Sequence, residues 1–197
     1  MKNMNQFQKP QIYLASASPR RAELLTQMGV NFELLSVDID ETPAKQEDVD
    51  EYVGRLAYQK AVEGHKKALD KTIPVLGADT AIDINGLILG KPRDYDDACR
   101  MMKLLSGKTH RVLTAVALVG EKIQQHVIQI TYVTMRDISD HEIDQYWQSG
   151  EPIDKAGSYA IQGIAAKFIS KIEGSYSGVM GLPIYETAKI LAEYELN

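Results

Sequence analysis

Hydroxyl and basic side chains gather near the start of the chain, in the run Ser16-Ala17-Ser18-Pro19-Arg20-Arg21. Ser18 before Pro19 is typical of a helix start, because a hydroxyl can cap free N–H groups and proline fits the first helical position. The N–H groups and the positive end of the helix dipole favour an anion. Arg20 and Arg21 match pairs of phosphate oxygens, and Ser16 adds a donor. The run predicts a phosphate site; the alternative is an ordinary capped surface helix.

Acidic side chains form a second group, in the loop Asp38-Ile39-Asp40-Glu41 and at Asp79. Mg²⁺ and Mn²⁺ prefer such oxygen ligands, and Mg²⁺ usually takes one or two carboxylates together with water and substrate phosphate. The loop acids are also compatible with a solvated loop. Asp79 follows Ile-Pro-Val-Leu-Gly-Ala, where an unpaired carboxylate costs on the order of several kcal/mol. A metal, a lysine or a catalytic role would each offset that cost, and a structural ion pair is the alternative.

Two lysines and a glycine-rich stretch complete the candidate residues. Lys60 is expected on a long helix, and Lys91 precedes Pro92, which holds the backbone at Lys91 extended. Each lysine is equally compatible with a surface position. In residues 157–163 the glycines allow close backbone approach, and Gln162 both donates and accepts hydrogen bonds, as reading the edge of a base requires. A loop that merely turns the chain is the alternative.

Motifs of several other chemistries are missing from the sequence. It contains no G-x-x-x-x-G-K-[ST] phosphate loop, no G-x-G-x-x-G dinucleotide turn, no paired-cysteine zinc motif and no G-x-S-x-G elbow. The histidines show no metal-binding spacing on one helix face, and Cys99 lies in a helical run. The sequence therefore disfavours catalysis by histidine, cysteine or serine.

The elements that must position these residues alternate between short apolar runs and amphipathic segments, which predicts an α/β fold. Asn85-Gly86 predicts a tight hairpin, Gly29 a helix end, and Ser139 with Glu142 a capping box. We expect strands at residues 12–15, 32–37, 73–82, 87–89, 112–119, 123–135 and 167–172, and helices at residues 19–28, 47–69 and 94–105, after Ser139 and after Pro183.

The amino-acid composition argues against nucleic acid and membranes as binding partners. The chain has 197 residues, 44% hydrophobic and 25% charged, as in an ordinary protein of one domain or two closely joined lobes. The net charge of −5 disfavours non-specific nucleic-acid binding, which depends on many Lys and Arg contacts. No apolar run approaches the roughly 20 residues of a membrane helix, and the start lacks a signal-peptide core. With Cys99 as a lone cysteine, we expect a cytoplasmic protein without membrane or nucleic-acid partners.

Segments along almost the whole chain resemble the Maf family in order and spacing. The resemblance implies the α/β Maf fold, similar to that of inosine triphosphate pyrophosphatases, with an extended mixed sheet and two lobes flanking a cleft. It also implies a single Maf domain over residues 10–197 and a homodimer. Residues 1–9 lie outside the resemblance, and we expect them to form a flexible tail. The segments are Leu14-Ala15-Ser16-Ala17-Ser18-Pro19-Arg20-Arg21, Lys60-Ala61, Gly77-Ala78-Asp79-Thr80, Gly90-Lys91-Pro92, Leu105-Ser106-Gly107, Asp154-Lys155-Ala156-Gly157, Ile161-Gln162-Gly163 and Val179-Met180-Gly181-Leu182-Pro183.

The activity implied by this resemblance is that of a house-cleaning pyrophosphatase, which converts a nucleoside triphosphate into a monophosphate and pyrophosphate. Arg20, Thr80 and Gln162 resemble the specificity positions of the branch that acts on dTTP and UTP, with modified pyrimidine nucleotides as further candidates. The 7-methyl-GTP branch instead resembles Ser-Pro-Trp-Arg-Arg and Ser-Asp-Gln at these places, and neither occurs here.

The resemblance also assigns roles at the site. The catalytic acid falls on Asp79, which would act as the base, and the phosphates would lie among Ser16, Ser18, Arg20, Arg21, Lys60 and Lys91. Mg²⁺ or Mn²⁺ would bind Asp79 and a loop acid, Asp40 or Glu41. Two alternatives stay open: a nucleotide-binding regulator of cell division and septum formation without turnover, and a hydrolase of the inosine triphosphate type.

Overall fold

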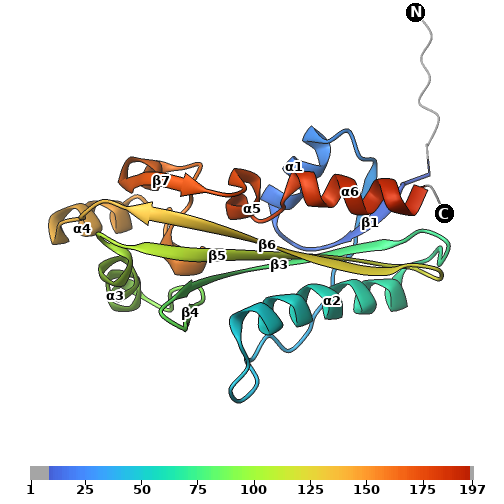
Figure 1. Cartoon of the computed structure of the whole chain (residues 1–197), viewed down its shortest axis with the longest axis horizontal. Helices are drawn as coiled ribbons and strands as arrows, with labels where there is room; N and C mark the ends of the chain where they lie inside the picture. Colours follow the sequence, from blue (N-terminus) through green and yellow to red (C-terminus); the bar gives the residue numbers. More distant parts are fainter. Residues whose placement is uncertain (1–8, 196–197) are drawn as a thin grey trace, which may run out of the picture.

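The computed structural model describes residues 9–195, which form a mixed seven-stranded sheet with helices on both faces (Figure 1). The strand order is β2-β1-β3-β5-β6-β7, and β4 pairs with β3 outside this path. The strands are β1 (Ile12–Ala15), β2 (Phe32–Leu34), β3 (Val75–Ile84), β4 (Leu87–Leu89), β5 (Thr109–Val119), β6 (Gln124–Met135) and β7 (Ile169–Glu173). The predicted α/β class is confirmed.

Helices cover the two faces unequally. One face of the sheet is covered by α2 (Val49–Lys67), and the other by α1 (Pro19–Gln27), α5 (Tyr176–Met180) and α6 (Ile184–Glu195) (Figure 1). At one end of the molecule lie α3 (Tyr95–Leu105), α4 (Asp140–Gln148) and the short 3₁₀ helices η1 (Ala156–Ser158) and η2 (Ile164–Phe168). Separate buried clusters lie under α2, under α1 and α6, and around α3 and α4. Within residues 9–195 no helix is both long and apolar enough to cross a membrane.

The long strands β3 and β5 consist mainly of apolar residues, whereas β6 mixes apolar and polar residues. β3, β5 and β6 pair antiparallel along most of their length, whereas β1 pairs parallel with both β2 and β3. β3 is buried at nine of its ten positions, because α2 covers one face and the other helices cover the opposite one. A strand buried on both faces is nearly continuously apolar, and Asp79 and Asp83 are the charged exceptions in β3.

Several predicted turns and caps are confirmed. The hairpin at Asn85-Gly86 has φ values of +55° and +80°, as a type I′ turn requires. Asp94 accepts a hydrogen bond from the Asp97 amide at the start of α3. Ser139 and Glu142 form the reciprocal capping box of α4. Gly29, with φ of +74°, follows the last turn of α1.

Other predicted bounds were wrong. The strand expected at residues 32–37 ends at Leu34, because β1 pairs with it only as far as Leu14↔Leu34 before the chain turns away. The expected strand 73–82 begins two residues later and extends to Ile84, and the expected strand 167–172 begins at Ile169, because η2 continues through Phe168. The short helix α5 was not expected at all.

The predicted flexible tail lies almost entirely outside the described residues. Residues 1–8 are not described, and the remaining residue, Lys9, forms an ion pair with Asp70 at 2.7 Å. The division into a tail and one domain of two lobes stays a prediction.

Candidate active site

A short stretch of β3 has an open edge. β1 pairs with β3 only up to Ala15↔Gly77, and β4 pairs with it only from Ile82↔Leu89 onward. Between these, residues 78–81 of β3 have a strand partner only on the β5 side. Successive residues of a strand point to opposite faces, so Asp79 points toward α2 and Thr80 toward α1 and α5. A ligand at this edge can therefore reach both faces of the sheet.

On the α2 face, Asp79 is ion-paired and almost buried. Its Oδ1 accepts a hydrogen bond from Lys60 Nζ at 2.7 Å, and the residue is 8% exposed. The same Lys60 Nζ lies 2.6 Å from Glu41 Oε1. These contacts depend on close packing of α2 against β3, since a Cβ atom added at Gly77 would lie 2.3 Å from the carbonyl oxygen of Ala57. The structure thus brings together Asp79, Lys60 and Glu41, three of the residues to which the resemblance assigns candidate roles.

The surroundings of Asp79 change its acidity. Burial raises the pKa of the Asp79 carboxyl above its ordinary value, and the positive charges of Lys60 and Arg21 oppose that change without cancelling it. A carboxylate whose pKa is raised accepts a proton more readily near neutral pH, which suits a general base.

The two loop acids occupy different places. Glu41 reaches Lys60, whereas Asp40 is exposed and accepts a hydrogen bond from the Thr42 amide at 2.9 Å. Hydrogen bonding by the Thr42 side chain, and then by its amide, lowers the pKa of Asp40. Asp40 lines a separate open groove along α2 together with Arg55. Of the two candidates, Glu41 is the one linked to Asp79.

The carboxylates fit a metal that is shared with a substrate. Within the described part of the chain no group of three or more His, Cys, Asp or Glu side chains could hold a metal alone. Mg²⁺ commonly uses one or two carboxylates and takes its other ligands from phosphate and water. Asp79 and Glu41, on either side of Lys60, match that donor set.

The turn between β1 and α1 has the predicted shape with one difference. Pro19 stands at the first helical position after Ser18, as expected. The Ser18 hydroxyl, however, makes no capping hydrogen bond; instead the Ser18 amide donates to Ser16 Oγ at 3.2 Å. The predicted capping hydrogen bond was therefore wrong, because the Ser18 hydroxyl accepts no hydrogen bond from the amides of the first helical turn. The Ser18 hydroxyl is left without that capping role.

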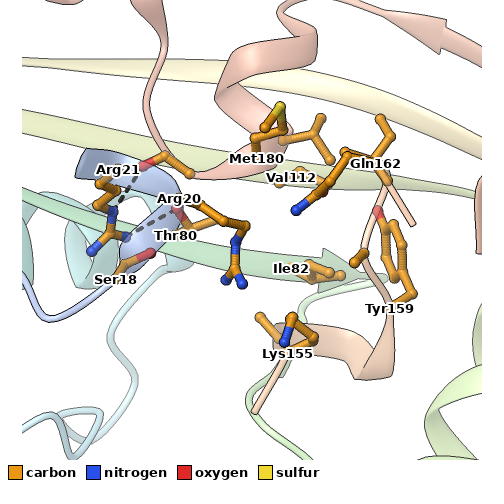
Figure 2. A pocket seen from close by; sticks show the side chains of 15 residues that line it. Ser18, Arg20, Arg21, Thr80, Ile82, Val112, Lys155, Tyr159, Gln162 and Met180 are labelled. Carbon is orange, nitrogen blue, oxygen red and sulfur yellow. Dashed lines mark hydrogen bonds between the residues drawn. The ribbon is translucent and has the colours of Figure 1, made fainter. Parts of the chain in front are cut away.

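The adjacent arginines have different environments. Arg21 donates to the Gly181 carbonyl at 2.8 Å and to Thr80 Oγ1 at 3.3 Å (Figure 2). It also donates to Ser16 Oγ at 3.1 Å. Arg21 therefore links the turn between β1 and α1 to β3 and to the end of α5 by hydrogen bonds. Arg20 is half-buried, and among residues 9–195 no side-chain hydrogen bond or ion pair is found for it. Its guanidinium extends into a hollow (Figure 2) and is the one available to an anion.

This hollow lies on the Thr80 face, and we call it the Thr80 hollow. Thr80 and Gln162 lie on it with Arg20, so the structure brings the three predicted specificity residues together (Figure 2). Ile82 and Val112 add apolar surface suited to the face of a base. Thr80 Oγ1 lies 3.0 Å from Thr114 Oγ1, which in turn donates to the Gly178 carbonyl at 2.7 Å, so the Thr80 side chain is fixed.

Some residues of the Thr80 hollow were not assigned from the sequence. Lys155 and Tyr159 both line it (Figure 2). Lys155 lies between Asp154, with φ of +62°, and Gly157, with φ of +64°. A cation beside a glycine turn was the available signal for Lys155, whereas the position of Tyr159 depends on packing that no local pattern shows.

Lys91 is the predicted phosphate residue that the structure places apart. It is exposed and does not line the Thr80 hollow, and no ion pair is found for it within residues 9–195. The neighbouring Gly90 carbonyl accepts a hydrogen bond from the Gly157 amide at 2.9 Å, so the Lys91 backbone adjoins the wall that carries Lys155. Its role toward phosphate stays a prediction.

The chain is similar to known proteins over nearly its full length. A family profile described as Maf-like protein matches residues 11–194. A dTTP/UTP pyrophosphatase of Aliivibrio fischeri is 50% identical over 188 residues, which cover 93% of this chain and 98% of that protein. Proteins of the same description from Photobacterium profundum and Aromatoleum aromaticum are each 50% identical, and they cover 90% and 93% of this chain and 93% and 95% of their own lengths.

Proposed function

The chain belongs to the Maf family, and on that premise we propose that it is a nucleoside triphosphate pyrophosphatase that hydrolyses dTTP and UTP, and modified pyrimidine nucleotides of similar shape, to the monophosphate and pyrophosphate. The observation that carries the proposal is the open edge of β3. There, the buried Asp79 and its partner Lys60 lie on one face of the strand. The Thr80 hollow, which both polar and apolar side chains line, lies on the other face. The name shared by the relatives supports the choice of substrate.

The Thr80 hollow suits a pyrimidine. Uracil and thymine present carbonyl acceptors and one N–H donor, and the amide of Gln162 can satisfy both types of group. Ile82, Val112 and Met180 supply apolar contacts to the ring. Arg20 enters the hollow from the turn between β1 and α1 (Figure 2), so its guanidinium would lie where the nucleoside joins its phosphates. We assign base recognition to Gln162, Thr80 and Arg20.

The chemistry follows from the α2 face. Asp79 accepts a proton from a water molecule through its Oδ2, while Oδ1 keeps its hydrogen bond from Lys60. The water oxygen forms a bond to the α-phosphorus, the bond from that phosphorus to the oxygen bridging to the β-phosphorus breaks, and pyrophosphate leaves. Lys60, Arg20 and Lys91 stabilise the charge on the phosphates, and the backbone amides of the turn do the same.

A divalent cation, Mg²⁺ or Mn²⁺, belongs to this proposal. Asp79 and Glu41 would hold it together with the triphosphate, and when bound it neutralises phosphate charge and favours the attack of water. We also propose that the protein is a cytoplasmic homodimer that binds neither nucleic acid nor membranes. The family resemblance supports the dimer, the lone Cys99 fits a reducing compartment, and the net charge of −5 argues against nucleic acid.

The substitution Asp79→Asn tests the proposed base. It should lower kcat for dTTP and UTP by about a hundredfold or more, since a catalytic proton acceptor is lost. Asp70→Asn is the matched control, because Asp70 forms a surface ion pair with Lys9. Near-normal turnover by folded Asp79→Asn would show that the base is another group.

A substrate panel with Mg²⁺ or Mn²⁺ separates the alternatives. Release of pyrophosphate from dTTP and UTP supports the proposal, and release of single phosphates contradicts it. A regulator without turnover would bind these nucleotides and release nothing. A hydrolase of the inosine triphosphate type would instead prefer inosine triphosphate.

A further inference from the structure

The first turns of α2 hold the acidic loop that carries Glu41. Tyr52 Oη donates to the carbonyl of Glu41 at 3.1 Å, and Arg55 Nη2 donates to the carbonyl of Thr42 at 3.2 Å. Tyr52 and Arg55 are three residues apart and so share one side of the helix, and the Arg55 guanidinium carbon lies 5.7 Å from the centre of the Tyr52 ring. Two successive carbonyls of the loop are thus bound by one helix, which the loop approaches from β2 (Figure 1).

Arg55 is itself fixed by the end of the same loop. Its Nε and Nη2 donate to the two carboxylate oxygens of Glu47 at 2.6 and 2.8 Å. Glu47 Oε2 also accepts a hydrogen bond from the Ala44 amide at 2.8 Å. The hydrogen bonds from Arg55 are the main cause that lowers the pKa of Glu47 to about 2, so this carboxylate stays ionised at neutral pH. Bidentate pairs of this type fix direction as well as distance.

Glu41 needs such support because burial does not fix it. Its side chain is 56% exposed, whereas those of Lys60 and Asp79 are 12% and 11% exposed. An exposed glutamate has many rotamers, and holding it at one place costs conformational entropy. Binding the carbonyls of Glu41 and Thr42 fixes the backbone from which the carboxylate extends.

We propose that Tyr52 and Arg55 are positioning residues that hold the acidic loop so that Glu41 reaches Lys60 beside Asp79. Neither residue lines the Thr80 hollow, and both act through Glu41. The catalytic consequence of this inference rests on the proposed function. The hydrogen bonds from Tyr52 and Arg55 to the loop, which we call the clamp, can be tested without substrate or metal.

Hydrogen exchange measured by mass spectrometry tests the clamp on the full chain without nucleotide or metal. Tyr52→Phe removes only a hydroxyl, and Arg55→Met removes the charge but keeps a long side chain. In each variant, amides of residues 40–47 should exchange about tenfold faster or more, since hydrogen bonds to a fixed partner are lost. Arg136→Met is the matched control, because Arg136 also binds a glutamate, Glu142, and the carbonyls of Lys167 and Asp137, remote from Glu41.

Kinetics with dTTP then distinguishes a role of Tyr52 and Arg55 in positioning Glu41 from a role in stabilising the fold alone. Tyr52→Phe and Arg55→Met should lower kcat by about tenfold, leave KM within about twofold and raise the Mg²⁺ concentration needed for half-maximal rate. Arg55→Lys, which keeps one charged donor, should give intermediate values, and Arg136→Met should behave as wild type.

Unchanged exchange in residues 40–47 of both variants would overturn the proposal. Faster exchange with unchanged kcat and unchanged Mg²⁺ dependence would also overturn it, because the loop would then move without affecting Glu41. Failure of the proposed function has a different signature: the wild-type protein would not hydrolyse dTTP, and the exchange comparison would alone decide whether the clamp exists.

Discussion

Lowering the pH should destabilise the folded protein through His110. This side chain is 2% exposed, and its Nε2 lies 2.8 Å from the hydroxyl of Tyr159. Its Nδ1 is buried and has no hydrogen-bond partner among the described residues. Burial lowers the pKa of His110 from 6.5 to about 4. The folded protein therefore keeps His110 neutral at pH values where the unfolded chain is already protonated.

The sign and size of the effect follow from proton linkage. Below pH 6.5 the unfolded chain binds a proton that the folded protein does not bind until the pH reaches about 4. Stability is therefore fully present above pH 6.5, falls as the pH drops, and is lost below about pH 4. The loss from this group should be about 2 kcal/mol at about pH 5 and roughly 3 kcal/mol in total.

Urea unfolding at a series of pH values, compared with His110→Gln, measures this term. Glutamine does not titrate, and its amide can still bind the Tyr159 hydroxyl. Carboxylates such as Glu47 and Glu142, whose pKa values are lowered to about 2 mainly by hydrogen bonds from arginines, affect both proteins alike. Between about pH 7.5 and about pH 5, wild type should lose about 2 kcal/mol more than the variant. Parallel curves would refute the reasoning.

Two further predictions concern the site. Gly77→Ala should destabilise the protein by about 1–3 kcal/mol and lower kcat, because the added Cβ would lie 2.3 Å from the carbonyl of Ala57 and would push α2, with Lys60, away from Asp79. Thermal unfolding and dTTP turnover check this. Gly54→Ala, where the added Cβ would lie 3.5 Å from Ile128 Cδ1, controls for loss of a glycine. Gln162→Ala should reduce discrimination among nucleotides more than it slows the best substrate; measured kcat/KM values that fall equally for all nucleotides would contradict that role.

Local pattern predicted most elements and the chemical character of the site. The capping box at Ser139, the hairpin at Asn85-Gly86 and the alternation of strands and helices depend on near neighbours in sequence, so the residues themselves reveal them. The end of β2 and the open edge of β3 depend on which strand lies alongside and where it stops. No local pattern contains that information.

The arginine pair shows the same limit at the level of side chains. Arg20 and Arg21 have the same chemistry in the sequence, yet neighbouring residues of a helix point about 100° apart. Arg21 donates hydrogen bonds to Thr80 and to the Gly181 carbonyl, which are remote in sequence, and so links three segments of the chain. Arg20 instead extends into the Thr80 hollow. Similarly, no local pattern shows that Glu41, and not Asp40, contacts Lys60.

Successive side chains of β3 point to opposite faces of the sheet, so the residues proposed for base recognition and the residue proposed for hydrolysis lie on different faces. Substitutions at Thr80, Ile82 and their neighbours on β5 change one face of the sheet and leave the face that carries Asp79 untouched. With base recognition assigned to Thr80 and hydrolysis to Asp79, as proposed above, new base preferences can arise or be engineered without a change at Asp79. The same arrangement makes register essential, because a slip by one residue would exchange the two faces. The continuous pairing of β3 with β5 from Val75↔Val119 to Asp83↔Arg111 fixes the register and so opposes such a slip.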